Sequence, residues 1–328
     1  MLKHNLRKAA ANGNGVYVLG TDEAGYGPNL GPLLIGASAW RVPARQVADE
    51  LYEVLAECVT ADPADESGKL AIADSKRLYQ PGGGLANLER GVLAAMWLLE
   101  RRVSRWRELW PVLDPHSLTQ IDGLPWHDGF DEPLACEARE LAMRLDGGCQ
   151  NARVQLTGLQ ATAIFPAQFN AAVGRCDNKA EVLSLATLRL AERTLFALPE
   201  GPAIVLCDKH GGRNRYAALL QEVFPDELVR VRRESGELSV YDVRAAGRAV
   251  EFRFQPKGER HLPTALASMT AKYLRELAMR PFNLFWQRQV PGLAPTAGYP
   301  GDSRRFWNEI RAAQQRLQIA DDVLWRQR

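Results

Sequence analysis

Short apolar runs that each lead to an acidic residue occur twice along the chain. Residues 16–19 read VYVL and come shortly before Asp22, and residues 203–207 read AIVLC and come directly before Asp208. Apolar runs of this length, rich in β-branched residues and bounded by turn formers, predict buried strands. Each strand would therefore present an acid at its C-terminal end.

A helical pattern lies between these two predicted strands. Asp177 and Asn178 precede the stretch KAEVLSLATLRLAERTLFAL, in which leucines recur at helical spacing. Asn178 followed three residues later by Glu181 resembles a capping box and predicts that the helix begins there. A strand, a helix and a second strand in this order predict an α/β layer structure.

Two further stretches look like additions to that α/β layer. Residues 61–150 are rich in Asp, Gly, Pro and Trp and carry helical patterning, which predicts a mainly helical insertion or cap. Residues 228–255 alternate in polarity, with turn formers at Ser235-Gly236 and Ala246-Gly247. That alternation predicts a β-meander that lengthens or edges the sheet.

Composition and charge exclude several classes of protein. With 328 residues and a net charge of +2, the chain is long enough for a large core and is not a globally basic protein that coats DNA. The five cysteines form no CxxC pair, which favours reduced thiols. The N-terminus has no apolar signal region, and no stretch is long and apolar enough for a membrane span. We therefore expect a cytoplasmic protein without a membrane partner.

The stretch GTDEAGYGPNLGP, residues 20–32, joins two adjacent acids to a glycine-rich turn. Glycine-rich turns after strands usually bind phosphate, but Asp22 and Glu23 would repel a phosphate unless a divalent cation lay between them. The stretch matches neither the GxGxxG fingerprint nor a P-loop. It therefore indicates a metal site facing a phosphodiester, although acids and glycines also form ordinary surface turns.

Three separated motifs resemble those of the type 2 ribonuclease H family, the ribonucleases HII and HIII. They are TDEAGYGPNLGPLLIGA from residue 21, IADSKRL at 72–78 and ALASMTAKYLREL at 265–277; shorter similarities are VLCDKHGG, KGE and GYP. The resemblance implies a ribonuclease H-like α/β fold with a mixed central sheet and helices on both faces. Residues 1–60 and 151–328 would then form the catalytic domain around the insertion, ending in a C-terminal helical segment.

In this family four acids hold divalent cations, Mg²⁺ or Mn²⁺, at the scissile phosphate. The resemblance places Asp22 and Glu23 as the first pair and Asp208 as the acid ending a later strand. Glu259 in KGE matches the fourth metal ligand and catalytic acid. Because the gap between Asp208 and Glu259 is long, Asp242 and Glu251 remain alternatives for the fourth position.

The resemblance also implies substrate contacts. A glycine turn in the family contacts the ribose 2′-hydroxyl, a tyrosine packs against the sugar at the RNA–DNA junction, and we expect two lysines to approach backbone phosphates. The matching residues are Gly25, Tyr26, Gly27, Tyr299, Lys76 and Lys272. His210 lies close to Asp208, but a lone histidine beside a Gly-Gly turn is more often structural than a general acid.

The implied activity is metal-dependent endonucleolytic cleavage of the RNA strand in RNA/DNA hybrids, or of ribonucleotides embedded in duplex DNA. The products would carry 3′-hydroxyl and 5′-phosphate ends. Two alternatives stay open: a nucleic-acid-binding homologue with weak or no activity, and a metal nuclease of the same fold that acts on another substrate. The expected partner is an RNA/DNA hybrid or a ribonucleotide-containing DNA duplex, and the sequence leaves the question of protein partners open.

Overall fold

The computed structural model describes residues 15–46, 50–65, 67–79, 84–135, 138–176 and 178–327. Its helices and strands, in chain order, are β1 (Gly15–Ala24), β2 (Leu33–Pro43), η1 (Ala44–Gln46), α2 (Leu51–Val54), β3 (Val59–Thr60), β4 (Leu70–Ala71), α3 (Ser75–Leu78), α4 (Ala86–Leu98), α5 (Trp106–Leu113), α6 (Ser117–Ile121), η2 (Pro125–His127), α7 (Arg139–Ala152), β5 (Gln155–Ile164), α8 (Pro166–Cys176), α9 (Lys179–Ala197), β6 (Ala203–Asp208), α10 (Ala217–Val223), β7 (Arg230–Arg233), β8 (Ser239–Ala245), β9 (Arg248–Gln255), η3 (Gly258–Arg260), α11 (Leu262–Gln289), α12 (Pro300–Arg316) and α13 (Asp321–Leu324).

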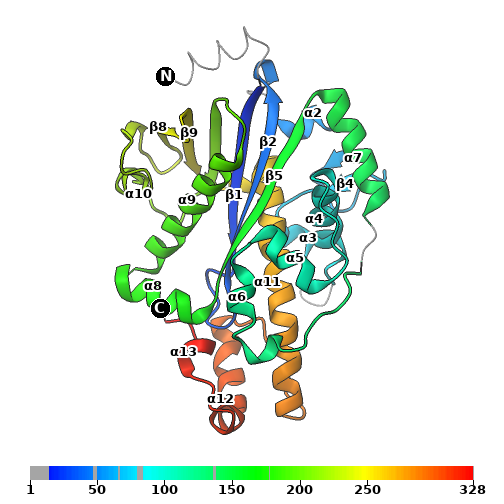
Figure 1. Cartoon of the computed structure of the whole chain (residues 1–328), viewed down its shortest axis with the longest axis vertical. Coiled ribbons are helices and arrows are strands. Elements are labelled where there is room, and N and C mark those ends of the chain that lie inside the picture. The colour runs from blue at the N-terminus through cyan, green and yellow to red at the C-terminus, as the bar shows by residue number, and fades with distance from the viewer. Residues whose placement is uncertain are drawn as a thin grey trace.

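One mixed sheet forms the centre of the molecule. Within the described ranges it has seven strands in the order β5-β2-β1-β6-β9-β8-β7 (Figure 1). β1 pairs antiparallel with β2 and parallel with β6, and β6 pairs parallel with β9. The C-terminal ends of β1, β6 and β9 therefore lie at the same edge of the sheet.

Alternating side chains of β1 enter different cores on the two faces of the sheet. Val16 and Val18 pack into a large core with α4, α7 and α11, whereas Tyr17 and Leu19 pack into a second core with α9 and α10. A strand that is apolar on both faces must be covered on both sides, since apolar surface left in water costs about 25 cal/mol per Å². The expected α/β architecture with helices on both faces is confirmed.

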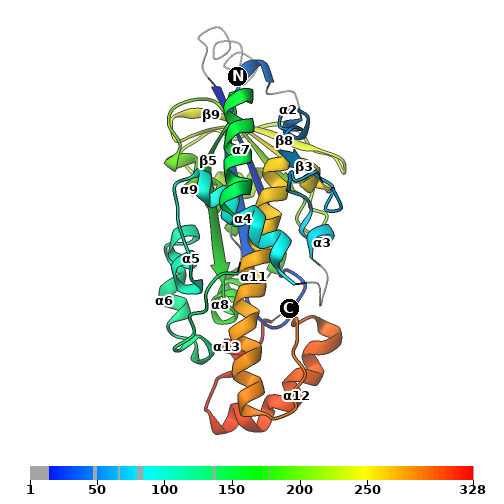
Figure 2. The ribbon, with the colours of Figure 1, turned by 90° about the vertical axis from the view of Figure 1, so that its right-hand side faces the viewer.

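Helix α11 lies unusually close to the sheet because glycines face it. A Cβ on Gly20 would lie 2.2 Å from the backbone of Pro263, and a Cβ on Gly36 would lie 2.3 Å from the carbonyl oxygen of Ala267. In Figure 2, α11 runs along the sheet and continues past its lower end, where α12 lies. The close contact fixes the first turns of α11 over the ends of β1 and β2.

The predicted elements occur with some differences. Asn178 caps α9 by accepting a hydrogen bond from the backbone N–H of Ala180, as expected, while Asp177 lies outside the described residues. β1 continues through Asp22 and Glu23, which pair with β2 instead of lying in the turn after a short strand. The partner strand is long and apolar, so the antiparallel ladder extends past the first apolar run.

The two predicted additions join the main body of the protein. β7, β8 and β9 form the meander, and β9 pairs with β6 inside the sheet, so that β8 and β7 lengthen the sheet. Side chains of α4, α5 and α7 share the large core with β1 and α11. The division at residues 1–60, 61–150 and 151–328 stays a prediction.

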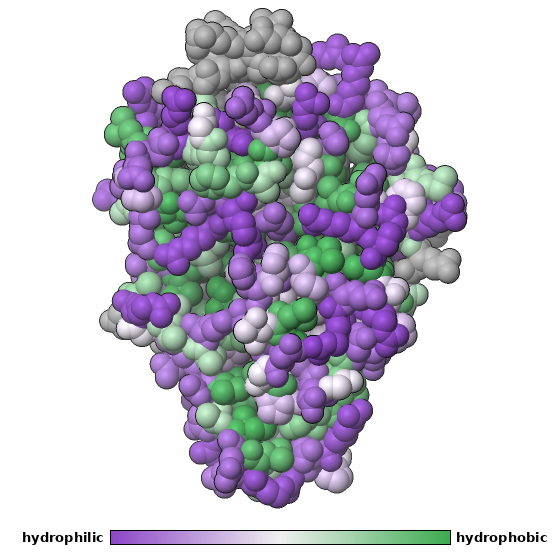
Figure 3. All heavy atoms as spheres, viewed as in Figure 1, coloured by the Kyte–Doolittle hydropathy of each residue, from purple (hydrophilic) through white to green (hydrophobic). Residues whose placement is uncertain are grey.

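The surface mixes polar and apolar side chains. On the face in Figure 3 they are interspersed. No helix in the described part of the chain has the length and apolar character needed to cross a membrane. The cysteines within that part, which are Cys58, Cys149, Cys176 and Cys207, are free thiols.

Candidate active site

Asp22 and Asp208 lie on neighbouring parallel strands at the same edge of the sheet. The register pairs Thr21 of β1 with Cys207 of β6, so the next residue on each strand is one of the two acids. Glu23 follows on β1, and the charge of Asp208 is the largest Coulombic influence on its pKa. The structure therefore brings these three predicted acids together.

Glu259 reaches the same place through the turn η3. The backbone N–H of Gly258 points to the Asp208 carboxylate at 3.5 Å, and a Cβ on Gly258 would lie 3.3 Å from the backbone nitrogen of Asp208. The neighbouring charge of Glu259 also raises the pKa of Glu23. The turn between β9 and α11 thus places Gly258 against Asp208 and brings the next residue, Glu259, close enough to act on the charge of Glu23.

The two alternative acids lie further from the edge. Glu251 pairs with Ile204 of β6, whereas Gln255 pairs with Asp208, so Glu251 is four residues, about 13 Å, back along the strand. Its carboxylate pairs with Arg253 at 2.6 Å, and Asp242 pairs with Arg232 at 3.5 Å. Asp242 and Glu251 pair with each other in the register of β8 and β9, so both lie, with their cationic partners, away from Asp208.

Burial and mutual repulsion govern the protonation of the carboxylates. Burial and the charge of Glu23 raise the pKa of Asp22 well above its usual range, and burial raises that of Asp208. Burial and Asp208 raise the pKa of Glu23 to about 7. Lys76, at the start of α3, lowers the pKa of both Glu23 and Asp208. One exposed lysine does not compensate for this many acids, so the site favours an additional cation.

Two serines position Asp22. Ser268 of α11 forms a hydrogen bond with the Asp22 carboxylate, and its Oγ lies 3.1 Å from Ser75 Oγ, within hydrogen-bond distance. Ser75 begins α3, the short helix that also carries Lys76. Ser268 lies within the third family-like motif, but the sequence alone assigned it no role, so its contact with the acid was missed.

The carboxylates of the four acids are chemically suited to bind a hard divalent cation. Carboxylate oxygens are the donors that Mg²⁺ and Mn²⁺ prefer, and Mg²⁺ keeps water and substrate oxygens among its ligands. Among the described residues, no three His, Cys, Asp or Glu side chains already surround a metal position. The protein would thus supply a few carboxylates, with water and phosphate completing the coordination.

Removing one of these acids should stabilise the metal-free protein. The folded-state pKa of Glu23, about 7, exceeds its ordinary 4.5. Between these values the folded state binds more protons than the unfolded state, so stability falls as pH rises from about 4.5 to about 7. In EDTA at pH 8 we expect Glu23→Gln to raise the thermal midpoint by about 2 °C or more.

The control for this prediction is Glu237→Gln, which neutralises an exposed acid in a surface ion pair. The gain from Glu23→Gln should shrink at pH 5, where Glu23 is already largely protonated. An equal or lower midpoint for Glu23→Gln at pH 8, compared with wild type, would contradict the repulsion described here.

The glycine turn has a buried side and an open side. Gly25 has a φ of +88°, and a Cβ there would lie 2.7 Å from the carbonyl oxygen of Pro32. Gly27 is exposed, and among the described residues a Cβ there would meet only the Tyr299 ring, at 3.8 Å. Gly25 is therefore needed by the fold of the turn itself, whereas Gly27 borders open space next to Tyr299.

The other residues predicted to contact the substrate are two tyrosines near this turn and two lysines. The ring of Tyr26 lies 4.9 Å from the Lys179 amine, and its pKa is raised by burial and by Glu23. Tyr299 is 49% exposed at the start of α12.

Lys272 binds Glu276 at 2.5 Å and lies over the Tyr79 ring at 4.4 Å. The amine of Lys272 is therefore engaged within the protein, and Lys76 is the lysine that influences the acids.

His210 is a buried structural residue. Its Nδ1 lies 3.0 Å from Ser184 Oγ, and its ring packs against Tyr216 and Phe254. Burial and the nearby Arg213 lower the pKa of His210 to about 4. A neutral imidazole enclosed in this way does not face the acids as a proton donor.

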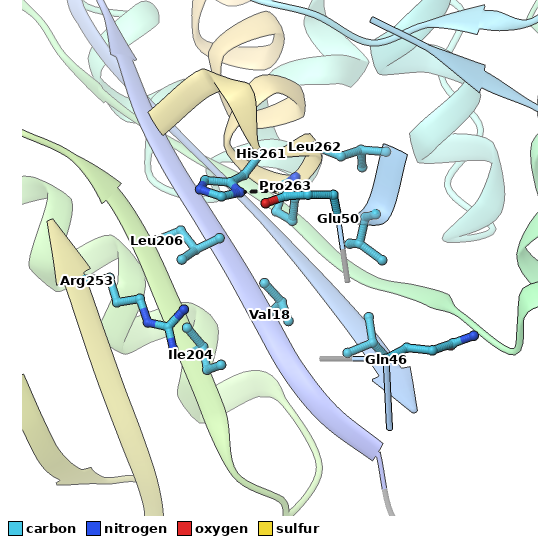
Figure 4. A pocket seen from close by; sticks show the side chains of 11 residues that line it. Val18, Gln46, Glu50, Ile204, Leu206, Arg253, His261, Leu262 and Pro263 are labelled. Atoms are coloured by element: carbon cyan, nitrogen blue, oxygen red, sulfur yellow. Dashed lines mark hydrogen bonds and ion pairs between the residues drawn. The ribbon is translucent and has the colours of Figure 1, made fainter. Parts of the chain in front are cut away.

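A small cavity of about 100 Å³ lies on the sheet below the first turn of α11 (Figure 4). Val18, Ile204 and Leu206 form its apolar floor. At its rim His261 Nδ1 lies 3.0 Å from the Glu50 carboxylate, the contact drawn as a dashed line. Among the described residues that line the cavity Glu50 is the single acid, and the Glu50–His261 contact supports the turn that carries Glu259.

No protein-family model matches the sequence, and no curated protein matches it either. Solved structures do match. They include ribonuclease HII of Archaeoglobus fulgidus, solved in complex with PCNA, with 17% identity over 95% of each chain and a TM-score of 0.46. This structure is of a ribonuclease HII.

Two further structures extend this similarity. Ribonuclease H2 of Pyrococcus horikoshii OT3 shares 15% identity over 94% of this chain and 92% of its own, with a TM-score of 0.46. Bst-RNase HIII in complex with Mn²⁺ shares 15% identity over 97% of this chain and 68% of its own, with a TM-score of 0.42.

Proposed function

We propose that this protein is a metal-dependent endoribonuclease of the ribonuclease H type. It would hydrolyse the RNA strand of RNA/DNA hybrids, or ribonucleotides embedded in duplex DNA, and leave 3′-hydroxyl and 5′-phosphate ends. The observation that carries the proposal is the convergence of Glu23 with Asp208 and Glu259, beside Lys76, where β1 and β6 end.

The proposed chemistry assigns a role to each group at this edge. Asp22, Glu23, Asp208 and Glu259 would hold Mg²⁺ or Mn²⁺, which supplies an activated water and charge neutralisation for in-line phosphodiester hydrolysis. Lys76 would approach a backbone phosphate, and the serine pair Ser75 and Ser268 would hold the Asp22 carboxylate in place.

The exposed side of the glycine turn, at Gly27, would distinguish RNA from DNA. The 2′-hydroxyl distinguishes a ribonucleotide from a deoxyribonucleotide at a given site. Gly27 offers backbone without a side chain, and the exposed ring of Tyr299 lies next to it. A sugar placed against both residues would contact the backbone of Gly27 and the neighbouring ring of Tyr299, since a Cβ on Gly27 would lie 3.8 Å from that ring.

Two substitutions test this assignment. Because a Cβ at Gly27 points into the proposed sugar site, we expect Gly27→Ala to reduce cleavage of a duplex with one embedded ribonucleotide by about tenfold or more, with folding retained. Tyr299→Ala should weaken binding at the RNA–DNA junction by removing a stacking surface. Steady-state kinetics with defined duplexes measures both effects.

Gly236→Ala is the matched control, because a Cβ there meets no atom of the described part of the chain within 4 Å. If both site variants cut the ribonucleotide duplex at the wild-type rate, this reading of the turn is wrong. A wild-type protein that cuts an all-DNA duplex equally well would instead indicate a nuclease with another substrate.

A further inference from the structure

The C-terminal segment, residues 324–327, packs against the glycine loop, residues 25–32. Leu30 and Trp325 form an antiparallel bridge, and the backbone N–H of Arg326 donates to the Asn29 carbonyl at 2.8 Å. Asn170 of α8 anchors the same segment by donating to the Trp325 carbonyl at 2.8 Å. Residues almost three hundred positions apart in the sequence therefore form one unit.

The side chain of Arg326 extends this contact into the loop. It is 2% exposed, and its Nη2 donates to the carbonyl of Gly25 at 2.5 Å and to that of Pro28. These two carbonyls flank Tyr26 and Gly27, the residues at the tip of the turn. One guanidinium group thus binds the backbone on both sides of the tip of the turn.

Arg275 of α11 holds the other half of the loop. It is buried and donates to the carbonyls of Leu30 at 3.2 Å and Pro32 at 2.6 Å. It also donates at 2.8 Å to the carbonyl of Ala297, two residues before Tyr299. Arg275 and Arg326, here called the arginine clamp, therefore connect the glycine loop to the segment that carries Tyr299.

Part of the arginine clamp costs free energy of folding. Nε and Nη1 of Arg326 have no hydrogen-bond partner within the described part of the chain, and burial together with Arg275 lowers the pKa of Arg326. Buried charged donors without partners cost free energy. Buried polar groups without hydrogen-bond partners are expected at functional sites, where the position of a residue matters more than the stability of the fold.

We propose that Arg326 is a positioning residue that fixes the glycine loop so that Gly27 and Tyr299 face one sugar of the substrate. This inference rests on the proposed function for the identity of the substrate. The geometric part, that Arg326 holds the loop rigid, does not depend on the reaction. The two parts can therefore fail separately.

The test compares Arg326→Ala with Arg316→Ala in the full chain; Arg316 is an exposed arginine at the end of α12. Hydrogen exchange is measured at the amides of Asn29 and Leu30, which donate to the Gly298 carbonyl. We expect faster exchange there in Arg326→Ala only. On a ribonucleotide duplex, KM should rise about tenfold or more in that variant, with a smaller change in kcat.

Wild-type exchange in the loop of Arg326→Ala would overturn the geometric part, and faster exchange with unchanged KM would overturn the role of Arg326 in positioning the loop for the substrate. A general loss of structure would instead accelerate exchange across the sheet and lower the thermal midpoint. If Arg326→Ala does not fold, Arg326→Lys gives the same readout, because lysine keeps the charge but lacks the planar fork. A wild-type protein without ribonuclease activity would refute the proposed function, and exchange would still decide whether Arg326 holds the loop.

Discussion

Asp22→Asn and Asp208→Asn are each expected to lower the rate of metal-dependent cleavage by about 10²-fold or more, because each removes charge that would hold the metal at the scissile phosphate. Asparagine keeps the shape of the side chain, and at Asp22 it can still bond to Ser268. Folding should therefore be retained. Single-turnover rates with saturating enzyme and Mn²⁺ measure the loss directly.

The matched control is Asp226→Asn, which neutralises an exposed acid in the turn after α10. Thermal unfolding in EDTA separates loss of chemistry from loss of structure. Because the pKa of Asp22 is raised by burial and by Glu23, Asp22→Asn should be at least as stable as wild type without metal. Retention of the wild-type cleavage rate in both variants would remove these acids from the reaction.

Glu259→Gln should cause a loss of similar size, because it removes the acid that η3 brings to Glu23. Glu259→Asp should also slow turnover, since a shorter side chain withdraws the carboxylate from the metal by about one methylene. The same single-turnover assay measures both variants.

Asp242→Asn and Glu251→Gln serve as comparisons, because these acids pair with Arg232 and Arg253 away from the edge. We expect near wild-type cleavage from both. If Glu259→Gln were fully active while one of these variants lost activity, the role of fourth acid would pass to that residue.

Much of the fold could be predicted from local pattern. The apolar runs at 16–19 and 203–207 lie within β1 and β6, Asn178 begins α9, and Ala246-Gly247 forms the turn between β8 and β9. These features depend on neighbouring residues and on left-handed backbone at Ala246 and Gly247. The extension of β1 through Glu23 depends on pairing with β2, which local pattern does not show.

Some features of the candidate site could be predicted from the sequence, and others could not. The sequence indicated Asp22, Glu23, Asp208 and Glu259, and their convergence follows from parallel pairing of β1 with β6 and from the turn η3. The bond from Ser268 to Asp22 and the contacts of Arg326 could not be predicted, because each joins residues hundreds of positions apart. Arg326 also lies in a C-terminal stretch with no motif around it.

The most direct measurement of the central claim is cleavage of a DNA duplex containing one ribonucleotide, with the ends of the products identified. With Mg²⁺ or Mn²⁺ we predict a single cut at the ribonucleotide, a 3′-hydroxyl on one product and a 5′-phosphate on the other, and no cut in EDTA or in the all-DNA duplex. Undiminished cleavage in excess EDTA would contradict catalysis by metal ions held on Asp22, Glu23, Asp208 and Glu259.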